Sequence, residues 1–410
     1  MKLIKRSYVD YLAMFLLLAV SGIPILQTQT YQVLFAIILA VLFLVRKGQQ
    51  MDEEILYMIG IILFLVLCQA VTFSFFKTIT IVGMVLRMLS AYFVVKLAGK
   101  YFLDYYIRIM VFFAITSLIF FIPIFVIPGF MDKLLAAAPS FFSYQYELWG
   151  FEVDRKTLLI YNLLQETPPL LRNPGPFWEP GAFGGFLAVA LIFNSIKQGE
   201  LFTRINCLFI FTIITTQSTT TYIALFIYIF LYILVQNYSS GAKLAVILFG
   251  VAGFVAFQTI PFLGDKIKTE NEGVKDAIEE NGGDTRLASA VLDWDDISRY
   301  PFAGRGLWDE TRVDKKFQFV IRNNGFTNFF AQWGIPFVLF FFYWYYRSFY
   351  QYCRIYGSGR LMPIVMILII CILSFGENYF NIPFFWAFAL LFIPFRDINP
   401  EDDTNDVALQ

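Results

Sequence analysis

The stretch RNPGPFWEPGAFGGFLAVALIF, residues 172–193, joins a stiff polar loop to a long apolar run. Its first fourteen residues hold three prolines and four glycines. Since proline fixes φ and lacks an amide donor, no regular helix is expected before Pro180. Pro180 suits the first position of a helix, where its missing N–H costs nothing. The apolar residues that follow predict a membrane-spanning helix near 181–196.

This helix start places two charged residues just outside an apolar span: Glu179 at or beside the N-cap, and Arg172 in the stiff lead-in. A helix N-terminus exposes free N–H groups and a partial positive charge. Together with an arginine it can bind a phosphate or carboxylate. The alternative is a rigid loop that only returns the chain to the membrane. That alternative carries less weight, because charged side chains beside lipid are costly without a task.

The composition indicates an all-α polytopic membrane protein. The chain has 410 residues, of which 58% are hydrophobic, and its mean hydropathy is +0.65. Repeated apolar runs of about twenty residues, the length of a membrane span, predict about 12 transmembrane helices. Two large segments are expected on the external, periplasmic side. The apolar N-terminal run has no small-residue cleavage site after it, so we expect an uncleaved first span.

Several classes of site are excluded or disfavoured by residue content. The chain contains no histidine, which excludes histidine acid–base catalysis and histidine metal ligation. The four cysteines stand far apart, without metal-like spacing, and are expected to fill apolar space. The net charge is zero, so no nucleic-acid partner is implied. We expect neither a metal nor a cofactor.

The apolar runs divide the chain into six regions. They are five N-terminal helices in 1–127, an external interfacial loop in 128–180, helices six to nine in 181–260, a large external lid in 261–326, helices ten to twelve in 327–395, and an acidic cytoplasmic tail in 396–410. The long segment after the fifth helix is rich in Tyr, Phe and Trp, which suits the membrane interface. The lid carries charges of both signs and is expected to fold.

Lysine and arginine placement orients this map, because cytoplasmic loops carry an excess of both. With both termini in the cytoplasm, one side collects Lys2, Lys5, Arg6, Arg46, Lys47, Lys96, Lys100, Lys197, Arg204, Lys243, Arg347, Arg354, Arg360 and Arg396. The opposite short turns, QTQT, TTQSTTT and GENYFNIP, carry neither residue type. We therefore expect a multi-pass membrane protein with both termini in the cytoplasm.

Three further arginines are candidates for phosphate binding. Arg87 interrupts the fourth apolar span near its middle, where an arginine must face the bundle or a water-filled cavity. Its alternative is a structural pairing with a carboxylate such as Glu377. Arg305 lies between two glycines in PFAGRGLWDE, and Arg286 opens an apolar helical pattern in the lid. Arginines converging with Arg172 could hold a pyrophosphate by bidentate hydrogen bonds. For most of the other lid charges, a solvated surface is the simpler interpretation.

Candidates for acid–base and sugar-binding roles lie at the same outer boundary. Glu179 is the first candidate base and Glu377, in the turn GENYFNIP, the second. Asn324, just before the tenth span, could bind sugar hydroxyls or cap a helix. Trp178 is the aromatic candidate for a sugar contact.

Four stretches together resemble the bacterial O-antigen polymerase and O-antigen ligase superfamily. They are RNPGPFWEPGAFGGFLAVAL, TTQSTTTYIALFIYI, TRLASAVLDWDDISRYPFAGRGL and NNGFTNFFAQWGIPFVLFF, which together cover roughly residues 170–345. The resemblance implies transfer of an oligosaccharide from undecaprenyl diphosphate to a sugar hydroxyl on the external face, without metal or nucleotide. It assigns Arg172 and Arg286 to the diphosphate. The resemblance also implies that the protein has a flippase and a chain-length regulator as partners.

One departure favours the polymerase branch, because ligases carry a functional histidine where this chain has Asn323 and Asn324. The sequence therefore predicts a glycosyltransferase that polymerises O-antigen or capsule repeat units. A ligase or protein O-oligosaccharyltransferase of the same fold is the first alternative. A flippase or other transporter of lipid-linked oligosaccharide is the second. The expected partners are the undecaprenyl diphosphate-linked oligosaccharide and the lipid bilayer.

Overall fold

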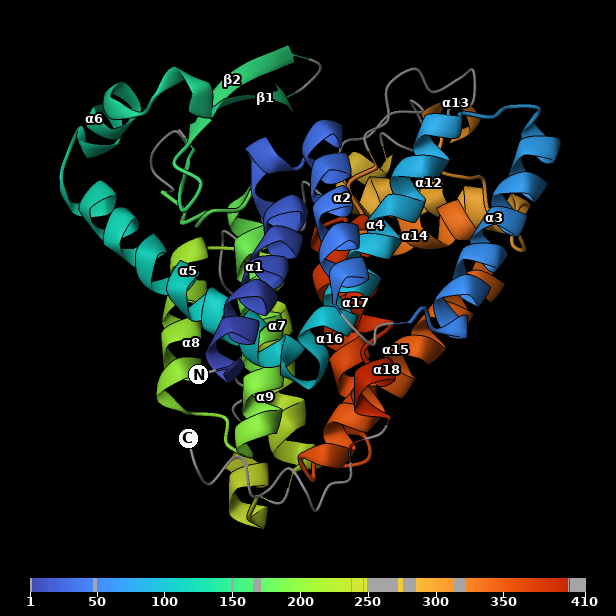
Figure 1. The fold of residues 1–410 in the computed structure, drawn as a ribbon. Coiled ribbons are helices and arrows are strands. Elements are labelled where there is room, and N and C mark those ends of the chain that lie inside the picture. The colour runs from blue at the N-terminus through green and yellow to red at the C-terminus, as the bar shows by residue number, and fades with distance from the viewer. Residues whose placement is uncertain are drawn as a thin grey trace. The chain divides into compact units, whose positions relative to one another are not determined.

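The computed structural model describes residues 2–46, 50–148, 151–164, 171–236, 238–245, 247–248, 272–275, 285–312, 322–396 and 398. These residues are mostly helical (Figure 1), as the sequence predicts. The first eight long helices are α1 (Lys2–Gly22), α2 (Gln29–Val45), α3 (Glu53–Phe73), α4 (Thr78–Ala98), α5 (Phe102–Val126), α7 (Pro180–Gln198), α8 (Arg204–Thr216) and α9 (Thr219–Val235). The C-terminal helices are α12 (Arg286–Arg299), α13 (Asp309–Arg312), α14 (Gly325–Trp333), α15 (Ile335–Ile355), α16 (Met362–Gly376), α17 (Pro383–Phe388) and α18 (Phe392–Phe395).

Three helical segments among the described residues are long and apolar enough to cross a membrane: Glu53–Phe73, Thr78–Val126 and Pro180–Gln198. Six shorter apolar helices accompany them: Tyr8–Gly22, Gln29–Val45, Arg204–Thr216, Thr219–Val235, Met362–Gly376 and Pro383–Phe395. Membrane association is thus supported in outline. The count of 12 spans stays a prediction, and most of the expected ninth span, near 243–260, lies outside the described residues.

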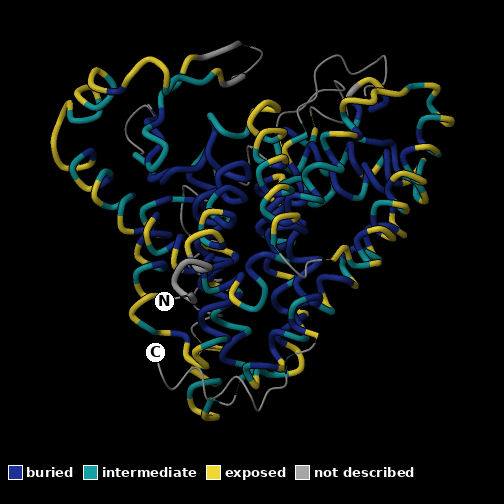
Figure 2. Tube along the Cα trace, viewed as in Figure 1, coloured by how far each residue is buried: buried dark blue, intermediate teal, exposed yellow. Residues whose placement is uncertain are grey.

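Burial distinguishes two kinds of apolar helix. In α7, 94% of the most apolar 18-residue stretch is buried. In α3, only 28% of the corresponding stretch is buried. Figure 2 shows exposed stretches along α3, where Phe64, Leu67 and Val71 are exposed. Large exposed apolar surfaces of this kind fit contact with lipid or a partner. Helix α7, which begins with Pro180, is instead a core helix that packs against α5 and α8.

The predicted tenth span, 327–346, is wrong as a single helix. It divides into α14 and α15 at Gly334, whose φ is +77°. A Cβ at this position would lie 2.4 Å from the carbonyl oxygen of Phe302. Pro336 then occupies the first turn of α15, where proline is tolerated. Helix α15 runs on to Ile355, past the predicted end.

The segment expected as an interfacial loop contains a small antiparallel sheet, so the fold is not purely all-α. The segment begins with the helix α6 (Phe130–Ala137). The sheet follows, formed by β1 (Ser143–Leu148), β2 (Phe151–Thr157) and β3 (Asn162–Leu163) in the order β1-β2-β3. Aromatic residues alternating with polar ones in SYQYEL favour a strand. A small apolar cluster that includes Phe121, Ile124, Tyr161 and Leu163 packs this segment against the end of α5.

The chain forms two compact units. The first comprises Met1–Gln49, Leu86–Leu225 and Ile393–Gln410, and the second comprises Gln50–Val85 and Phe226–Phe392. In unit 1, Arg46 Nη1 donates to Asp10 Oδ1 at 2.7 Å and to the Leu97 carbonyl at 2.5 Å. The first half of α1 therefore meets the C-terminal ends of α2 and α4.

Candidate functional site

The loop before α7 is held rigidly by a buried asparagine. Asn173 is fully buried and its Nδ2 donates to Ser117 Oγ (3.1 Å) and Thr215 Oγ1 (2.9 Å). Its Oδ1 accepts from the Gly175 amide at 3.0 Å. Gly175 has φ +53°, and a Cβ there would lie 2.7 Å from the Phe183 ring. These contacts fix the path of the chain between Arg172 and α7.

Arg172 is half-buried and is oriented by the end of α8. Its Nε donates to the carbonyl oxygen of Thr216, the last residue of that helix, at 3.2 Å. The next residue, Gln217, has a left-handed backbone (φ +48°), and its Nε2 donates to the Leu171 carbonyl at 3.0 Å. A helix C-terminus carries partial negative charge, which favours a guanidinium there.

Glu179 occupies the N-cap position of α7 as the sequence predicts, but its side chain does not cap the helix. It is half-buried, and its carboxylate makes no hydrogen bond or ion pair within the described part of the chain. An orienting contact from Glu179 to Arg172 is therefore not seen. The residue stands at the N-terminal end of α7, where a helix carries partial positive charge.

Trp178 is positioned by the small sheet, which the sequence analysis missed. Asn162 in β3 is fully buried, and its Nδ2 donates to the Phe177 carbonyl at 2.9 Å and to the Trp178 carbonyl at 3.4 Å. Tyr144 in β1 donates its hydroxyl to Asn162 Oδ1 at 3.0 Å. The sheet thereby fastens the two residues that precede Glu179.

Arg286 in unit 2 repeats the geometry of Arg172. It is the first residue of α12, whose N-cap Thr285 accepts a hydrogen bond from the Ala288 amide. Its Nε donates to the carbonyl oxygen of Gly376, the last residue of α16, at 3.1 Å. Each of the two arginines thus uses Nε on the terminal carbonyl of an apolar helix in its own unit. Besides Nε, each guanidinium carries four N–H groups on its two Nη nitrogens.

Unit 2 brings Arg286, Asn324 and Glu377 together. Glu377 is buried and follows Gly376 directly. Asn324 Nδ2 lies 3.4 Å from the Arg286 carbonyl. Gly325 permits the close packing, because a Cβ there would lie 2.2 Å from the Glu377 carbonyl oxygen.

Asn324 serves as a helix cap. Its Oδ1 accepts from the amides of Phe326 and Thr327, both at 3.1 Å, and the residue is fully buried. This geometry supports the capping role that the sequence left open beside a sugar contact.

Arg305 belongs to a buried ion network in the lid rather than to a solvated surface. Its Nη1 lies 2.6 Å from Asp296 Oδ1. Arg312 lies 2.8 Å and Arg322 3.0 Å from Asp293 Oδ1. Interpreting the lid charges as a solvated surface is wrong for this group and suits only pairs such as the exposed Arg299 and Asp295.

Burial governs the electrostatics of this network. It raises the pKa of Asp293, although Arg312 and Arg322 oppose that shift. It also lowers the pKa of Arg322, and the charge of Arg312 acts in the same direction. Three arginines and two aspartates leave the network with one net positive charge, so it acts as a cationic structural core for the lid.

Arg87 lies in α4 and contacts an amide rather than an acid. Its Nε donates to Gln32 Oε1 at 2.9 Å. Gln32 is in the first turn of α2, and its Nε2 donates to the Gln27 carbonyl at 2.7 Å. The guanidinium therefore reaches toward the polar turn QTQT. Within the described ranges, no group of three His, Cys, Asp or Glu side chains is arranged to hold a metal ion.

Comparison of the chain with protein-family models, curated proteins and solved structures finds no match. The function is therefore argued from the residues and their geometry.

Proposed function

We propose that this protein is a polysaccharide polymerase that extends a glycan on the external face of the bacterial inner membrane. It would transfer an oligosaccharide repeat unit from undecaprenyl diphosphate to a sugar hydroxyl of the acceptor. The observation that carries the proposal is the shared geometry of Arg172 and Arg286, each with Nε fixed on a helix-terminal carbonyl.

This geometry suits phosphate recognition. A fixed Nε orients the planar guanidinium, and its Nη donors match the spacing of phosphate oxygens. Pre-oriented donors lose little entropy when the charge on a leaving group develops. We therefore assign a phosphate-binding role to Arg172 and to Arg286, each from the geometry within its own unit.

The chemistry is a displacement at the anomeric carbon of the donor. The acceptor hydroxyl oxygen forms the new bond to that carbon, and the bond from carbon to the diphosphate oxygen breaks. Undecaprenyl diphosphate leaves with the bonding electron pair, and the arginines stabilise its charge. Glu179 takes the hydroxyl proton as general base, because its half-buried carboxylate does not cap α7. Glu377 is the second candidate base.

Gene deletion with complementation tests the proposal in cells. Loss of a polymerase should leave surface glycan of one repeat unit. Loss of a ligase should leave no glycan attached to its final acceptor. Loss of a flippase should leave lipid-linked units on the cytoplasmic side of the membrane. We expect the one-unit product, restored by the wild-type gene. Either of the other two products would overturn the proposal.

Substitutions at the two arginines link the phenotype to the site. Arg172→Ala and Arg286→Ala should each abolish the polymer while the protein still inserts. Lysine should restore it only in part, because its ammonium group keeps the charge but lacks the planar fork of donors that matches phosphate oxygens. Arg299→Ala is the matched control, since Arg299 lies on the same helix as Arg286 in an exposed pair. Normal polymer from both alanine variants would contradict the assignment.

A further inference from the structure

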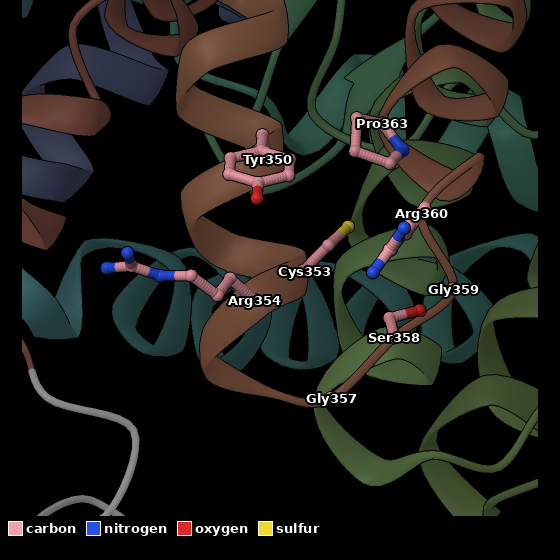
Figure 3. Close-up of a pocket in the computed structure, with 8 residues that line it drawn as sticks. All are labelled: Tyr350, Cys353, Arg354, Gly357, Ser358, Gly359, Arg360 and Pro363. Atoms are coloured by element: carbon pink, nitrogen blue, oxygen red, sulfur yellow. The ribbon is translucent and has the colours of Figure 1, made fainter.

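A small cavity lies at the turn between α15 and α16 in unit 2, and Arg354 and Arg360 are among the residues that line it. Residues around Gly357–Arg360 close a cavity of about 260 Å³ beside the end of α15 (Figure 3). Figure 3 shows the Arg360 side chain beside Ser358 and Cys353, whereas Arg354 extends away on the other side of α15. The predicted topology puts this turn on the cytoplasmic side, opposite the proposed catalytic face.

The turn itself is firmly held. Gly357 has φ +63°, and the Ser358 amide donates to the Cys353 carbonyl at 2.8 Å. Gln236, just after α9, donates from Nε2 to Ser358 Oγ. A Cβ on Gly359 would lie 3.3 Å from the Val235 carbonyl oxygen. The cavity is thus part of a packed turn.

The charge around this cavity has one sign. Residues 336–376 contain Arg347, Arg354 and Arg360 but no Asp or Glu. Arg347 is occupied by stacking over the Phe392 ring, at 4.0 Å from its centroid. Neither Arg354 nor Arg360 forms an ion pair with another described residue. The cavity also adjoins the first residues of α16, where the helix dipole is positive. An anion is therefore the complementary ligand.

The surface next to the cavity is apolar and exposed. On α15, Tyr346 and Tyr350 are exposed and stack with ring centroids 6.0 Å apart. Leu361, just before α16, and Ile364 and Leu368 on it are exposed as well. Exposed Tyr beside Arg at a helix end is typical of the level of lipid headgroups. A cavity of this size is below the roughly 300–1,000 Å³ of pockets that enclose a drug-sized ligand. It fits a headgroup whose acyl chains remain outside.

We infer that the α15–α16 turn binds the phosphate headgroup of an anionic membrane phospholipid. Arg360 holds the phosphodiester in the cavity, and Arg354 adds positive charge to the same turn from the other side of α15. The acyl chains lie along the exposed apolar residues beside the turn. The site is independent of the proposed transfer reaction and holds a structural or regulatory lipid.

Lipid binding to the purified protein tests this inference. Protein in detergent is titrated with phosphatidylglycerol, and bound lipid is counted by native mass spectrometry alongside thermal unfolding. Each basic residue near an anionic lipid is worth about 1 kcal/mol. The Arg354→Gln/Arg360→Gln variant should therefore bind roughly 30-fold more weakly and lose the lipid-induced rise in Tm. Phosphatidylcholine should bind no better to wild type than to this variant.

Arg204→Gln is the matched control, because Arg204 is exposed on the same predicted side and does not line the cavity. It should bind phosphatidylglycerol like wild type. If the double variant does not fold, each single variant should bind about fivefold more weakly. Equal binding by wild type and the arginine variants would overturn the inference. An equal Tm rise with inorganic phosphate alone would also overturn it, since it would identify a free-anion site instead.

Discussion

Glu179 begins α7 without capping it, and this separates its two candidate roles. An orienting role would require a contact with Arg172, whereas the structure gives Arg172 a backbone carbonyl on α8. The Glu179 carboxylate therefore suits the role of a general base better than that of a group that orients Arg172.

The Glu179→Gln variant tests this role, because glutamine keeps the shape but cannot accept the proton. We expect the polymerisation rate to fall roughly 10²–10⁴-fold, the usual contribution of general acid–base catalysis, while donor binding is retained. Glu200→Gln is the control, since Glu200 is exposed just beyond the other end of α7. Near-wild-type rates for Glu179→Gln would exclude it as the base.

Arg305 illustrates how a candidate ligand residue can serve the fold. Its Nη1 pairs with Asp296, which is almost fully buried. The Arg305→Ala variant should lower the free energy of unfolding by about 3 kcal/mol, because it weakens the compensation of a buried carboxylate. Arg299→Ala removes an exposed pair and should cost only about 0–1 kcal/mol. Thermal unfolding in detergent compares them, and equal small losses would show that the network contributes little.

At the scale of the elements, hydropathy predicts the positions of helices well. It does not predict the buried polar residues that hold loops in place by hydrogen bonds. The predicted spans near 78–97 and 205–216 agree with α4 and α8 within two residues, because a helix long enough to cross a membrane is apolar over most of its length. Asn162 and Asn173 could not be found in this way. Each is a single polar residue whose side-chain partners lie at least 18 residues away in the sequence, so neither leaves a spacing pattern.

The small sheet escaped prediction for a related reason. Its strands are short, and in a chain this rich in aromatic residues a brief alternation does not stand out. The buried lid network was missed because arginines and aspartates in a loop have the composition of a solvated surface. Only the fold reveals which of them are buried against each other.

The contact between β3 and the loop before α7 makes a prediction for these elements. Asn162→Ala removes the donor to the Phe177 and Trp178 carbonyls and should destabilise the protein by about 1–3 kcal/mol. It should lower polymerisation further by releasing the loop that carries Glu179. Tyr144→Phe deletes only the hydroxyl bonded to Asn162 and should cost about 0.5–1.5 kcal/mol. Full activity per folded molecule in Asn162→Ala would show that the sheet does not position the site.

For the whole molecule, the proposal depends on the orientation of the chain in the membrane. The distribution of Lys and Arg predicts both termini in the cytoplasm and residues 261–326 outside. In a cysteine-free background, an impermeant thiol reagent added outside should modify a Cys placed at Glu272 but not one placed at Gln49. The reverse labelling pattern would place Arg286 on the wrong face for an external polymerase.

The central claim is most directly tested by a polymerisation reaction with the purified protein. The protein is reconstituted with an undecaprenyl diphosphate-linked repeat unit, in a chelator and without nucleotide, and the products are separated by size. We predict a ladder of lipid-linked glycans longer than one repeat unit, which disappears in Arg172→Ala and Arg286→Ala. A ladder that forms equally with both variants, or unreacted substrate with folded wild-type protein, would contradict the account.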